Sequence, residues 1–351
     1  MPPSTLSLSY DAVLSTTFFN WSKTLHDTVS KSNYFFYHLM KEAEDSWELI
    51  DDLGDRAAFP LMYEIGTADS YSGYDPLDVT PTDGITTAFY EWRQASVPVS
   101  ISGLEEEKNS GEARMISLLK AKTKQAELGI HDFMNKSLLQ GNGGSSITSP
   151  YTSAANGSQF VDPLPLLIKY DPTTATTVGN IPQGTYSWWR NKTYNSTSST
   201  YKAFLKELRK LHRDVCKGPG GKPTMHLADE DSFGLYEAAL ADMHRNTSYQ
   251  RADIPFDNVL FRGKPVTWDE YVPDVQGGSA TQSTASGTWW MLNTEFWKMK
   301  VNRRRNFVAT TFQKPENGDS RVGHVLFMGA AVCGNRRKQG VMGGIDTTTA
   351  A

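Results

Sequence analysis

Two groups of side chains in this sequence have types and spacings that could support chemistry. His226, Asp229 and Asp231 fall close together, and imidazole and carboxylate groups are ligands that zinc takes in proteins. The same spacing is typical of a strand end followed by a helix that Asp229 caps, and we favour that interpretation. His212 lies one helical turn before Cys216, as a base would lie beside a thiol nucleophile. That pair lacks an orienting carboxylate or a helix N-terminus that would lower the pKa of the thiol.

Motifs of established catalytic sites do not occur in the chain. The sequence contains no phosphate-binding GxxxxGK[ST] loop, no GxGxxG after a strand, no HExxH and no GxSxG. Cys216 and Cys333 form no CxxC pair, and we expect both to be buried thiols. We therefore expect no enzymatic activity, no cofactor and no metal site.

Charge is distributed unevenly along the sequence. Residues 55–102 carry seven acids against Arg56 and Arg93, whereas residues 296–340 carry ten bases against two acids. Such asymmetry often marks an interaction with nucleic acid or with a complementary copy of the same chain. We expect a basic surface for a neighbouring chain or for DNA at the two densest basic runs. These runs are Arg303, Arg304 and Arg305, and then Arg336, Arg337 and Lys338.

Length and composition restrict the class of protein. The chain has 351 residues, 38% of them hydrophobic, and a net charge of −4, which fits a soluble globular protein of about two domains. No apolar run reaches the length of a membrane-spanning helix, and the N-terminus lacks the basic and apolar regions of a signal peptide. We therefore expect a protein that folds in a reducing cytoplasm and has no membrane partner.

The longest expected element is one amphipathic helix over residues 109–140. Its apolar side chains recur at three- and four-residue spacing, Asn109 and Glu112 have the spacing of a capping box, and Gly141 ends it. At 1.5 Å per residue the helix would be about 48 Å long, on the order of the diameter of a globule of this chain length. One helix would therefore span the width of the molecule.

Residues 55–102 are expected to form a long β-hairpin before this helix. An ascending strand over 56–65 and a descending strand over 85–102 flank a segment rich in Asp, Gly, Pro and Ser. Arms of about 14 to 18 residues would reach roughly 45–60 Å, and a two-stranded ribbon of that length cannot bury itself. We therefore expect the hairpin to contact an external partner; the alternative is a hairpin folded back on its own domain.

The remaining sequence predicts an apolar arm, an inserted α/β unit and returning strands. The arm carries dense aromatic residues, among them Phe18, Phe19 and Trp21, which need a packing partner. A linker rich in Gly, Ser and Thr precedes the α/β unit, in which helices are expected over 200–216 and 230–244. Strands return over 288–340, and the residues from 343 onward are expected to form a loose tail.

This order of elements resembles the major capsid proteins of tailed bacteriophages, which have the Hong Kong 97-like shell fold. Several stretches also resemble that family in local sequence, and together they span nearly the whole chain. These stretches are 178–191 with its WWRN, 255–274, 302–329 and 334–341.

The resemblance implies an α+β fold with an N-arm, an extended β-hairpin loop, a peripheral domain with a long spine helix, and an axial domain. The implied divisions are 1–54 for the arm, 55–103 for the extended loop, 104–149 for the spine helix, 150–287 for the axial domain, 288–345 for the peripheral sheet and 346–351 for the tail.

The resemblance also implies a function. The chain would be a major capsid protein that self-assembles, as hexamers and pentamers, into an icosahedral phage head enclosing double-stranded DNA. The implied partners are copies of itself, a separate scaffolding protein, a portal and a decoration protein, and the implied location is the virion capsid, assembled in the host cytoplasm. No lysine occurs between Lys41 and Lys108, so the lysine–asparagine crosslink of some family members is not available from this loop.

We expect aromatic burial to hold the subunits together and complementary charge to set the register of the hairpin on a basic neighbour. The residues expected in that contact are Arg56, Tyr71, Asp75, Asp78, Asp83, Trp92, Arg93, Phe18, Phe19 and Trp21. Two alternatives remain open. One is an encapsulin-like compartment, which shares the fold and packages protein cargo. The other is a soluble nucleic-acid- or glycan-binding protein that uses its Trp and Arg side chains as a monomer or small oligomer.

Overall fold

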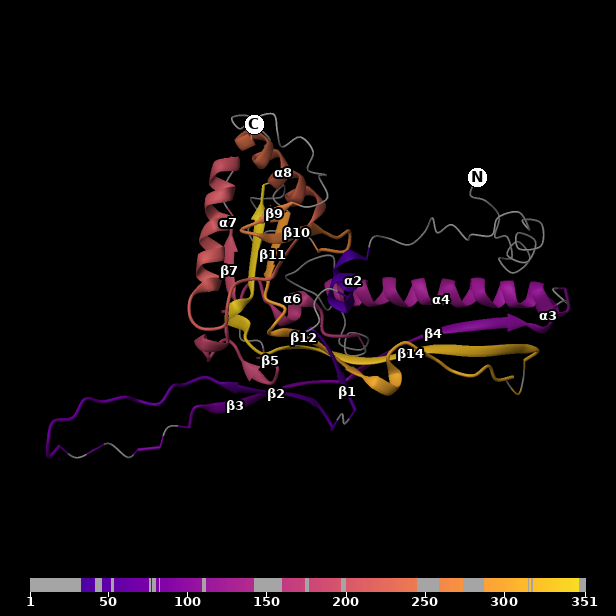
Figure 1. Ribbon diagram of the computed structural model, residues 1–351, viewed down its shortest axis with the longest axis horizontal. Coiled ribbons are helices and arrows are strands. Elements are labelled where there is room, and N and C mark those ends of the chain that lie inside the picture. The colour runs from indigo at the N-terminus through magenta and orange to yellow at the C-terminus, as the bar shows by residue number, and fades with distance from the viewer. Residues whose placement is uncertain are drawn as a thin grey trace.

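The computed structural model describes residues 33–41, 46–51, 54–75, 77, 80–81, 83–108, 112–141, 160–173, 177–196, 200–244, 259–273, 287–314, 316 and 318–346. These residues form two sheet units side by side, with the long helix α4 (Glu112–Gln140) along one unit and a hairpin that projects away on the opposite side (Figure 1). None of the described helices is long and apolar enough to cross a membrane. The expected arm residues Phe18, Phe19 and Trp21 lie outside the described residues.

The five-stranded unit contains the sheet on which α4 packs. Its strands are β1 (Trp47–Ile50), β12 (Trp297–Asn302), β14 (Ser320–Cys333) and β13 (Val308–Ala309), in that order, with β4 (Arg93–Ser102) also paired to β14. Strands β4 and β14 run antiparallel from Arg93 opposite Gly329 to Ser102 opposite Ser320. Helix α4 contacts both strands and buries a stripe at every fourth residue, namely Ala126, Ile130, Met134 and Leu138.

The predicted long helix is present as α4, and Asn109 of the predicted capping box lies outside the described residues. A short helix, α3 (Gly103–Lys108), already follows β4. The amide of Ser102 donates to Glu105 Oε2 and the amide of Glu105 donates to Ser102 Oγ, both at 3.2 Å, which is the capping-box pattern. Lys122 of α4 then pairs with Glu105 at 2.7 Å and joins the two helices.

The six-stranded unit carries two helices. Its strand order is β7 (Lys192–Asn195), β15 (Gly340–Ile345), β11 (Gly287–Leu292), β8 (Met225–Ala228), β10 (Lys264–Trp268) and β9 (Leu260–Phe261). Helix α7 (Tyr201–Cys216) packs over β7 and β15, and α8 (Glu230–His244) packs over β10 and β11 (Figure 1). The short elements before β7 are α2 (Tyr34–Lys41), α6 (Leu164–Leu167), β5 (Thr177–Val178), β6 (Ile181–Pro182) and η1 (Ser187–Trp189).

The expectation that residues 288–340 form one returning sheet is wrong, because their strands are divided between the two sheet units. Strand β11 belongs to the six-stranded unit and is buried at all six positions, whereas β12 alternates and belongs to the five-stranded unit. The turn between them closes where the amide of Trp297 donates to the carbonyl of Asn293 at 3.1 Å. Residues 343–345 are likewise not a loose tail, because they belong to β15, a fully buried inner strand.

Two chain connections between the units, β11–β12 and β14–β15, are clasped together by a pair of hydrogen bonds between side chain and backbone. Asn293 follows β11, and Gln339 precedes β15. The amide of Asn293 donates to Gln339 Oε1, and Gln339 Nε2 donates to the carbonyl of Asn293, both at 2.9 Å. Both residues are buried, so the β11–β12 and β14–β15 connections are held together at this point.

The predicted hairpin is shorter than expected. Among the described residues of this segment, pairing within the hairpin is confined to β2 (Ala57–Met62) and β3 (Ile85–Tyr90), from Ala57 opposite Tyr90 to Met62 opposite Ile85. The rest of the expected descending arm is β4, which turns away and pairs with β14. The paired stem is therefore six residues long, and the expected arms of 14 to 18 residues are wrong.

Candidate assembly interface

The hairpin stem is fixed to the body by backbone and side-chain hydrogen bonds. The Tyr90 hydroxyl donates to the carbonyl of Cys333 at 2.8 Å, and the amide of Phe89 donates to the carbonyl of Gly179 at 3.1 Å. Gly179 has a φ of 60°, and a Cβ atom there would crowd Ala88 and Tyr90. The sequence thus places glycine where the stem packs against the turn between β5 and β6.

The other strand of the stem rests on the five-stranded unit. Lys300 Nζ donates to the carbonyl of Ala58 at 3.0 Å and lies 5.7 Å from the centre of the Phe59 ring. A Cβ atom at Gly334 would overlap that ring, so the glycine makes room for it. The stem is therefore held by the five-stranded unit and by the turn between β5 and β6, and its direction relative to the body is set.

From the last pair of the stem outward, the hairpin is exposed and carries large apolar side chains. Exposed fractions run from 64% at Leu77 to 80% at Ile65, with Tyr71, Met62 and Ile85 between them. Tyr74 is fully exposed. Apolar surface of this extent at the end of a projecting ribbon is typical of a contact with another molecule.

Acidic side chains are interleaved with these apolar ones. Asp75 accepts the amide of Ser72 at 3.0 Å and closes a turn at the tip, while the hydroxyl of Tyr63 donates to the carbonyl of Asp83 at the base of the loop. Residues 57–92 contain no Lys, Arg or His. Asp78 lies outside the described residues. The described part of the hairpin tip therefore has a negative surface.

Three of the residues predicted for the inter-subunit contact lie at the root of the hairpin and not at its tip. Arg56 forms an exposed ion pair with Glu91 at 3.2 Å across the stem. Trp92 packs half-buried against the main core, and Arg93 begins β4, where it is also half-buried. Tyr71, Asp75 and Asp83 lie on the projecting loop, whereas Arg56, Trp92 and Arg93 lie where the hairpin joins the body.

The first predicted basic run is exposed. Arg303, Arg304 and Arg305 form the short helix η3 (Arg303–Arg305) after β12, and Asn302 caps it by accepting the amide of Arg304 at 2.8 Å. Arg303 pairs with Asp51 at 3.0 Å, and Arg305 donates to Gln94 at 2.9 Å. Their guanidinium groups remain on the surface of the five-stranded unit, as a contact with an acidic partner requires.

The second predicted basic run is not a surface, and the expectation for Arg336 is wrong. Arg336 in η4 (Arg336–Lys338) is 1% exposed, and its guanidinium donates four hydrogen bonds of 2.8 to 3.1 Å. The acceptors are the carbonyls of Leu167 and Trp189 and the side chains of Gln183 and Asn191. Burial lowers the pKa of Arg336 to about 10, yet these acceptors satisfy the charge.

Lys338 is also buried, which corrects the second part of that expectation. Its ammonium group reaches the carbonyls at the C-terminal end of α7, at distances of 2.8 to 3.3 Å. The acceptors are the carbonyls of Cys216, Lys217, Gly218 and Gly221. A cation there donates hydrogen bonds to carbonyls that have no partner within the helix. Its positive charge also lies next to the negative end of the helix dipole, which is favourable. Of this run, only Arg337 is exposed.

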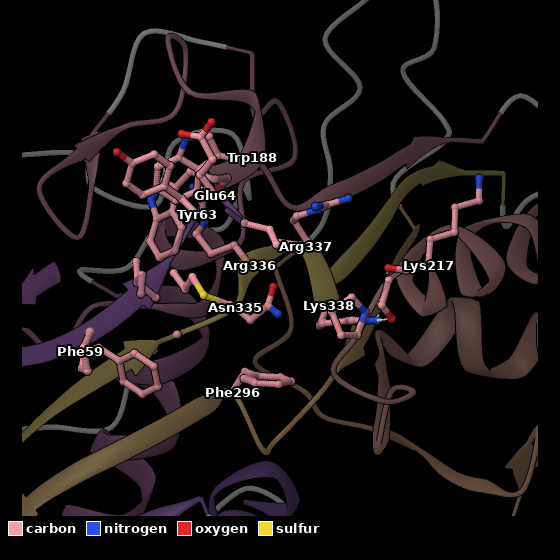
Figure 2. A pocket seen from close by; sticks show the side chains of 18 residues that line it. Phe59, Tyr63, Glu64, Trp188, Lys217, Phe296, Asn335, Arg336, Arg337 and Lys338 are labelled. Carbon is pink, nitrogen blue, oxygen red and sulfur yellow. Dashed lines mark hydrogen bonds between the residues drawn. The ribbon is translucent and has the colours of Figure 1, made fainter. Parts of the chain in front are cut away.

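A cleft of about 350 Å³ marks the place where the hairpin leaves the body. Figure 2 shows Tyr63, Glu64 and Trp188 on one side of it, with Lys217 and Arg337 on the other. The rings of Tyr63 and Trp188 stack with their centres 5.1 Å apart. The cleft therefore lies between the hairpin stem and the six-stranded unit and forms the joint between them.

The candidate metal cluster is dispersed by the fold. Asp229 caps α8, accepting the amide of Ser232 at 3.3 Å, and it also accepts the amide of Thr288 at 2.7 Å, which confirms the capping interpretation. His226 points into an aromatic core beside Phe261 and Trp289, and burial lowers its pKa to about 3. Among the described residues, no three His, Cys, Asp or Glu side chains gather as metal ligands would.

The sequence correctly places His212 beside Cys216, but the pair is unsuited to nucleophilic chemistry. Their nearest atoms, Sγ and Nδ1, are 3.5 Å apart. Burial raises the pKa of the Cys216 thiol and lowers the pKa of His212. A thiol with a raised pKa is a poor nucleophile at neutral pH, so the geometry alone confers no activity.

The sequence reading missed a buried carboxylate at the meeting point of three elements. Asp269 accepts both hydrogen bonds from Asn135 of α4, at 2.9 and 3.1 Å, and the amides of Phe35 and Tyr271. Burial raises its pKa. Nothing in the local pattern around Asp269 signals this role, because its partners are as far as 234 residues away.

No protein-family model and no curated protein matches this chain. Solved structures do match it. The cyanophage A-1(L) capsid asymmetric unit aligns with a TM-score of 0.62 at 12% identity, covering 95% of this chain and 99% of that one. The capsid of a native GTA particle aligns with a TM-score of 0.58 at 9% identity, covering 92% and 93%.

An encapsulin structure from Synechococcus elongatus matches in the same way. The holo-SrpI complex aligns with a TM-score of 0.56 at 10% identity and covers 97% of both chains. At such identities the likeness establishes the fold. The chain has the Hong Kong 97-like shell fold over nearly its whole length, as the sequence resemblance predicted.

Proposed function

We propose that this chain is the major capsid protein of a tailed bacteriophage, and that it self-assembles into an icosahedral head enclosing double-stranded DNA. The proposal is carried by the exposed apolar hairpin. Half of the large apolar side chains exposed among the described residues lie between residues 62 and 89. They are Met62, Ile65, Tyr71, Tyr74, Leu77, Ile85 and Phe89.

A second copy of the chain is the partner that best fits this hairpin. The stem is anchored so that the loop projects away from both units, and no other described element of the chain accompanies the loop (Figure 1). A projecting element that inserts into a different surface of the next copy makes a heterologous contact, and such contacts form rings when the rotation between copies closes. Rings of five and six are the units from which an icosahedral shell is built.

Charge supports a specific placement of the loop. Asp75 and Asp83 lie on the negative loop, and Arg303, Arg304 and Arg305 lie exposed on the five-stranded unit. In the proposed shell the loop of one subunit lies over this basic turn of its neighbour. Exposed ion pairs contribute only about 0–1 kcal/mol each, so the apolar loop residues supply most of the contact energy and the charges set the register.

The proposed capsid function implies further protein partners and a location. A separate scaffolding protein, a portal and a decoration protein would complete the particle. The chain would reside in the virion capsid after assembly in the host cytoplasm. The shell contacts require no catalysis, cofactor or metal ion.

Microscopy of the purified full-length chain tests the proposal. We expect closed icosahedral particles in negative stain, and we expect nuclease-resistant double-stranded DNA in particles recovered from infected or induced cells. Monomers or small oligomers under assembly conditions would contradict a shell function.

An encapsulin-like compartment is the second candidate, and the match to the holo-SrpI complex favours it. It predicts particles of the same kind that contain a co-purifying protein and no nuclease-protected DNA. The contents of purified particles, resolved by gel electrophoresis with and without nuclease, separate the two candidates.

The third candidate, a small soluble protein that stacks bases or sugars on tryptophan, has little support. Trp189, Trp289, Trp290 and Trp297 are buried, and the other described Trp side chains are half-buried. Stacking surfaces need exposed rings. Sedimentation of the purified chain as a stable monomer would be the result that revives it.

A further inference from the structure

Helix α7 presents an outer face composed only of cations. Six of its residues face the core: Phe204, Leu205, Leu208, Leu211, His212 and Val215. Every exposed residue of the helix is a lysine or an arginine. These residues are Lys202, Lys206, Arg209, Lys210 and Arg213, which we call the α7 stripe.

The spacing of the stripe places its charges in one row. Lys202, Lys206, Arg209 and Arg213 follow one another by four, three and four residues, so they share one side of the helix. The row is about 16 Å long at 1.5 Å per residue. One strand of a DNA duplex presents a phosphate about every 3.4 Å along the axis, so a row of this length can face about five phosphates.

The two acids of α7 offset only part of the charge of the five cations in the stripe. Glu207 accepts the hydroxyl of Ser196 at 2.7 Å, and Asp214 pairs with Lys217 at 2.6 Å beyond the helix end. Lys210 lies 4.9 Å from the centre of the Tyr194 ring, which leaves its charge on the surface. The stripe is therefore positively charged along its length.

The composition of this face favours a polyanion over a protein partner. Protein interfaces are depleted in lysine and rich in aromatic residues at their centres. No exposed residue of α7 is apolar, in contrast to Tyr71, Tyr74 and Leu77 on the hairpin loop. Phosphate backbones are bound by Lys and Arg side chains without apolar contacts.

The neighbouring helix limits where a polyanion can lie. Glu230 and Asp231 of α8 are exposed, and Glu237 is half-buried. Helices α7 and α8 pack side by side, so a duplex crossing both would meet these acids. A duplex lying along α7 alone avoids them.

We propose that the α7 stripe is the surface of this chain that binds the phosphate backbone of the enclosed DNA. The inference rests on the proposed capsid function and adds which unit of the subunit contacts the DNA. Binding would be independent of base sequence, because the stripe offers charge and no base-reading side chains. Arg303, Arg304 and Arg305 would instead serve the contact with a neighbouring subunit.

Salt dependence of DNA binding tests the stripe. The full-length chain, kept below the concentration at which light scattering detects particles, is titrated onto a labelled 24-base-pair duplex at several salt concentrations. Five phosphate contacts predict a loss of affinity of about 500-fold between 50 and 200 mM salt. The variant K206Q/R209Q/R213Q keeps two contacts and should lose only about tenfold over the same range.

A matched triple variant provides the control. R303Q/R304Q/R305Q removes the same number of exposed cations from η3 and should keep the salt dependence of the wild-type chain. The charge-conserving variant K206R/K210R should also keep it. A reduced salt dependence in the η3 variant, with an unchanged one in the α7 variant, would overturn the proposal, as would weak and salt-independent binding by the wild-type chain.

Microscopy separates failure of this inference from failure of the proposed function. Wild-type chain and the K206Q/R209Q/R213Q variant should both form closed particles, because the stripe is not a subunit contact. If the wild-type chain formed particles and the variant did not, α7 would be an interface between subunits. That result would contradict the DNA-binding inference and leave the proposed shell function intact. An absence of particles from the wild-type chain would sink the proposed function itself, whatever the DNA titration shows.

Discussion

The hydroxyl of Tyr90 donates a hydrogen bond to the backbone carbonyl of Cys333 at 2.8 Å, across 243 residues of sequence. Tyr90 ends the second strand of the hairpin stem, and Cys333 ends β14. Both residues are buried, and burial raises the pKa of the Tyr90 phenol, so the hydroxyl stays protonated and remains a donor. This bond fixes the root of the projecting hairpin to the longest strand of the five-stranded unit.

Tyr90→Phe should destabilise the subunit by about 1–3 kcal/mol, because the carbonyl of Cys333 would be left buried without this partner. Urea denaturation of the unassembled chain measures the change. Tyr74→Phe, at a fully exposed ring on the hairpin loop, is the control and should leave the midpoint unchanged. Equal midpoints for Tyr90→Phe and the wild-type chain would show that the bond does not hold the stem.

Arg336→Lys should destabilise the chain by about 2–4 kcal/mol. A lysine keeps the charge but cannot reproduce the planar fork that reaches four acceptors at once. Arg337→Lys, one residue along and exposed, should change stability by less than about 0.5 kcal/mol. Thermal unfolding of the two variants side by side makes the comparison, and similar losses in both would contradict a structural role for Arg336.

Acidic pH should lower the stability of the folded chain because of His226. The ring is fully buried, neither of its nitrogens has a hydrogen-bond partner, and burial lowers its pKa from 6.5 to about 3. The unfolded chain therefore binds a proton below pH 6.5 that the folded chain does not bind until about pH 3. The resulting decrease in the free energy of unfolding is absent above pH 6.5 and grows as the pH falls, to about 2 kcal/mol at pH 5.

His226→Phe should flatten this pH dependence, because phenylalanine fits the aromatic surroundings and does not titrate. His212, whose pKa burial also lowers, would supply the remaining slope. The measurement is the urea midpoint at pH 7 and at pH 5, with the exposed His324→Gln variant as control. Loss of the same stability on acidification in wild-type and His226→Phe chains would exclude His226 as the source.

The hairpin loop should be needed for particles but not for folding. Replacing Tyr71, Tyr74 and Leu77 together by Ser removes exposed apolar surface, so the thermal midpoint of the unassembled chain should stay the same. Closed particles should be absent in negative stain. The matched variant with Phe, Phe and Met at these positions keeps the apolar surface and should still assemble. Normal particles from the serine variant would show that the loop does not join subunits.

Local periodicity in the sequence predicted the helices well. The helices expected over residues 200–216 and 230–244 are observed as α7 and α8 with ends within one residue, because an apolar stripe at helical spacing specifies a helix without any distant partner. The partner of β4 could not be predicted in this way. Strand β4 pairs with β14, more than 200 residues later. Its residue pattern fits a strand paired with β14 as well as the second arm of a hairpin, so the pattern does not identify the partner.

Charge was the least reliable local signal for the candidate site. Arg336 and Lys338 stand in a basic run that favours a surface, yet distant carbonyls from Leu167, Trp189 and the end of α7 enclose them. The stripe on α7 was visible as spacing in the sequence, but only burial shows that its cations are the whole exposed face. Burial of a charge depends on acceptors that sequence spacing alone does not bring together.

The clasp between Asn293 and Gln339 joins two chain connections within the body of the subunit. The β11–β12 and β14–β15 connections leave the six-stranded sheet side by side, and this pair of buried hydrogen bonds joins them at that point. In the proposed shell, a subunit that fits rings of five and of six would adapt most easily at an element with few contacts to its own body. That element is the hairpin loop, whose contacts with the rest of the described chain are concentrated at its stem.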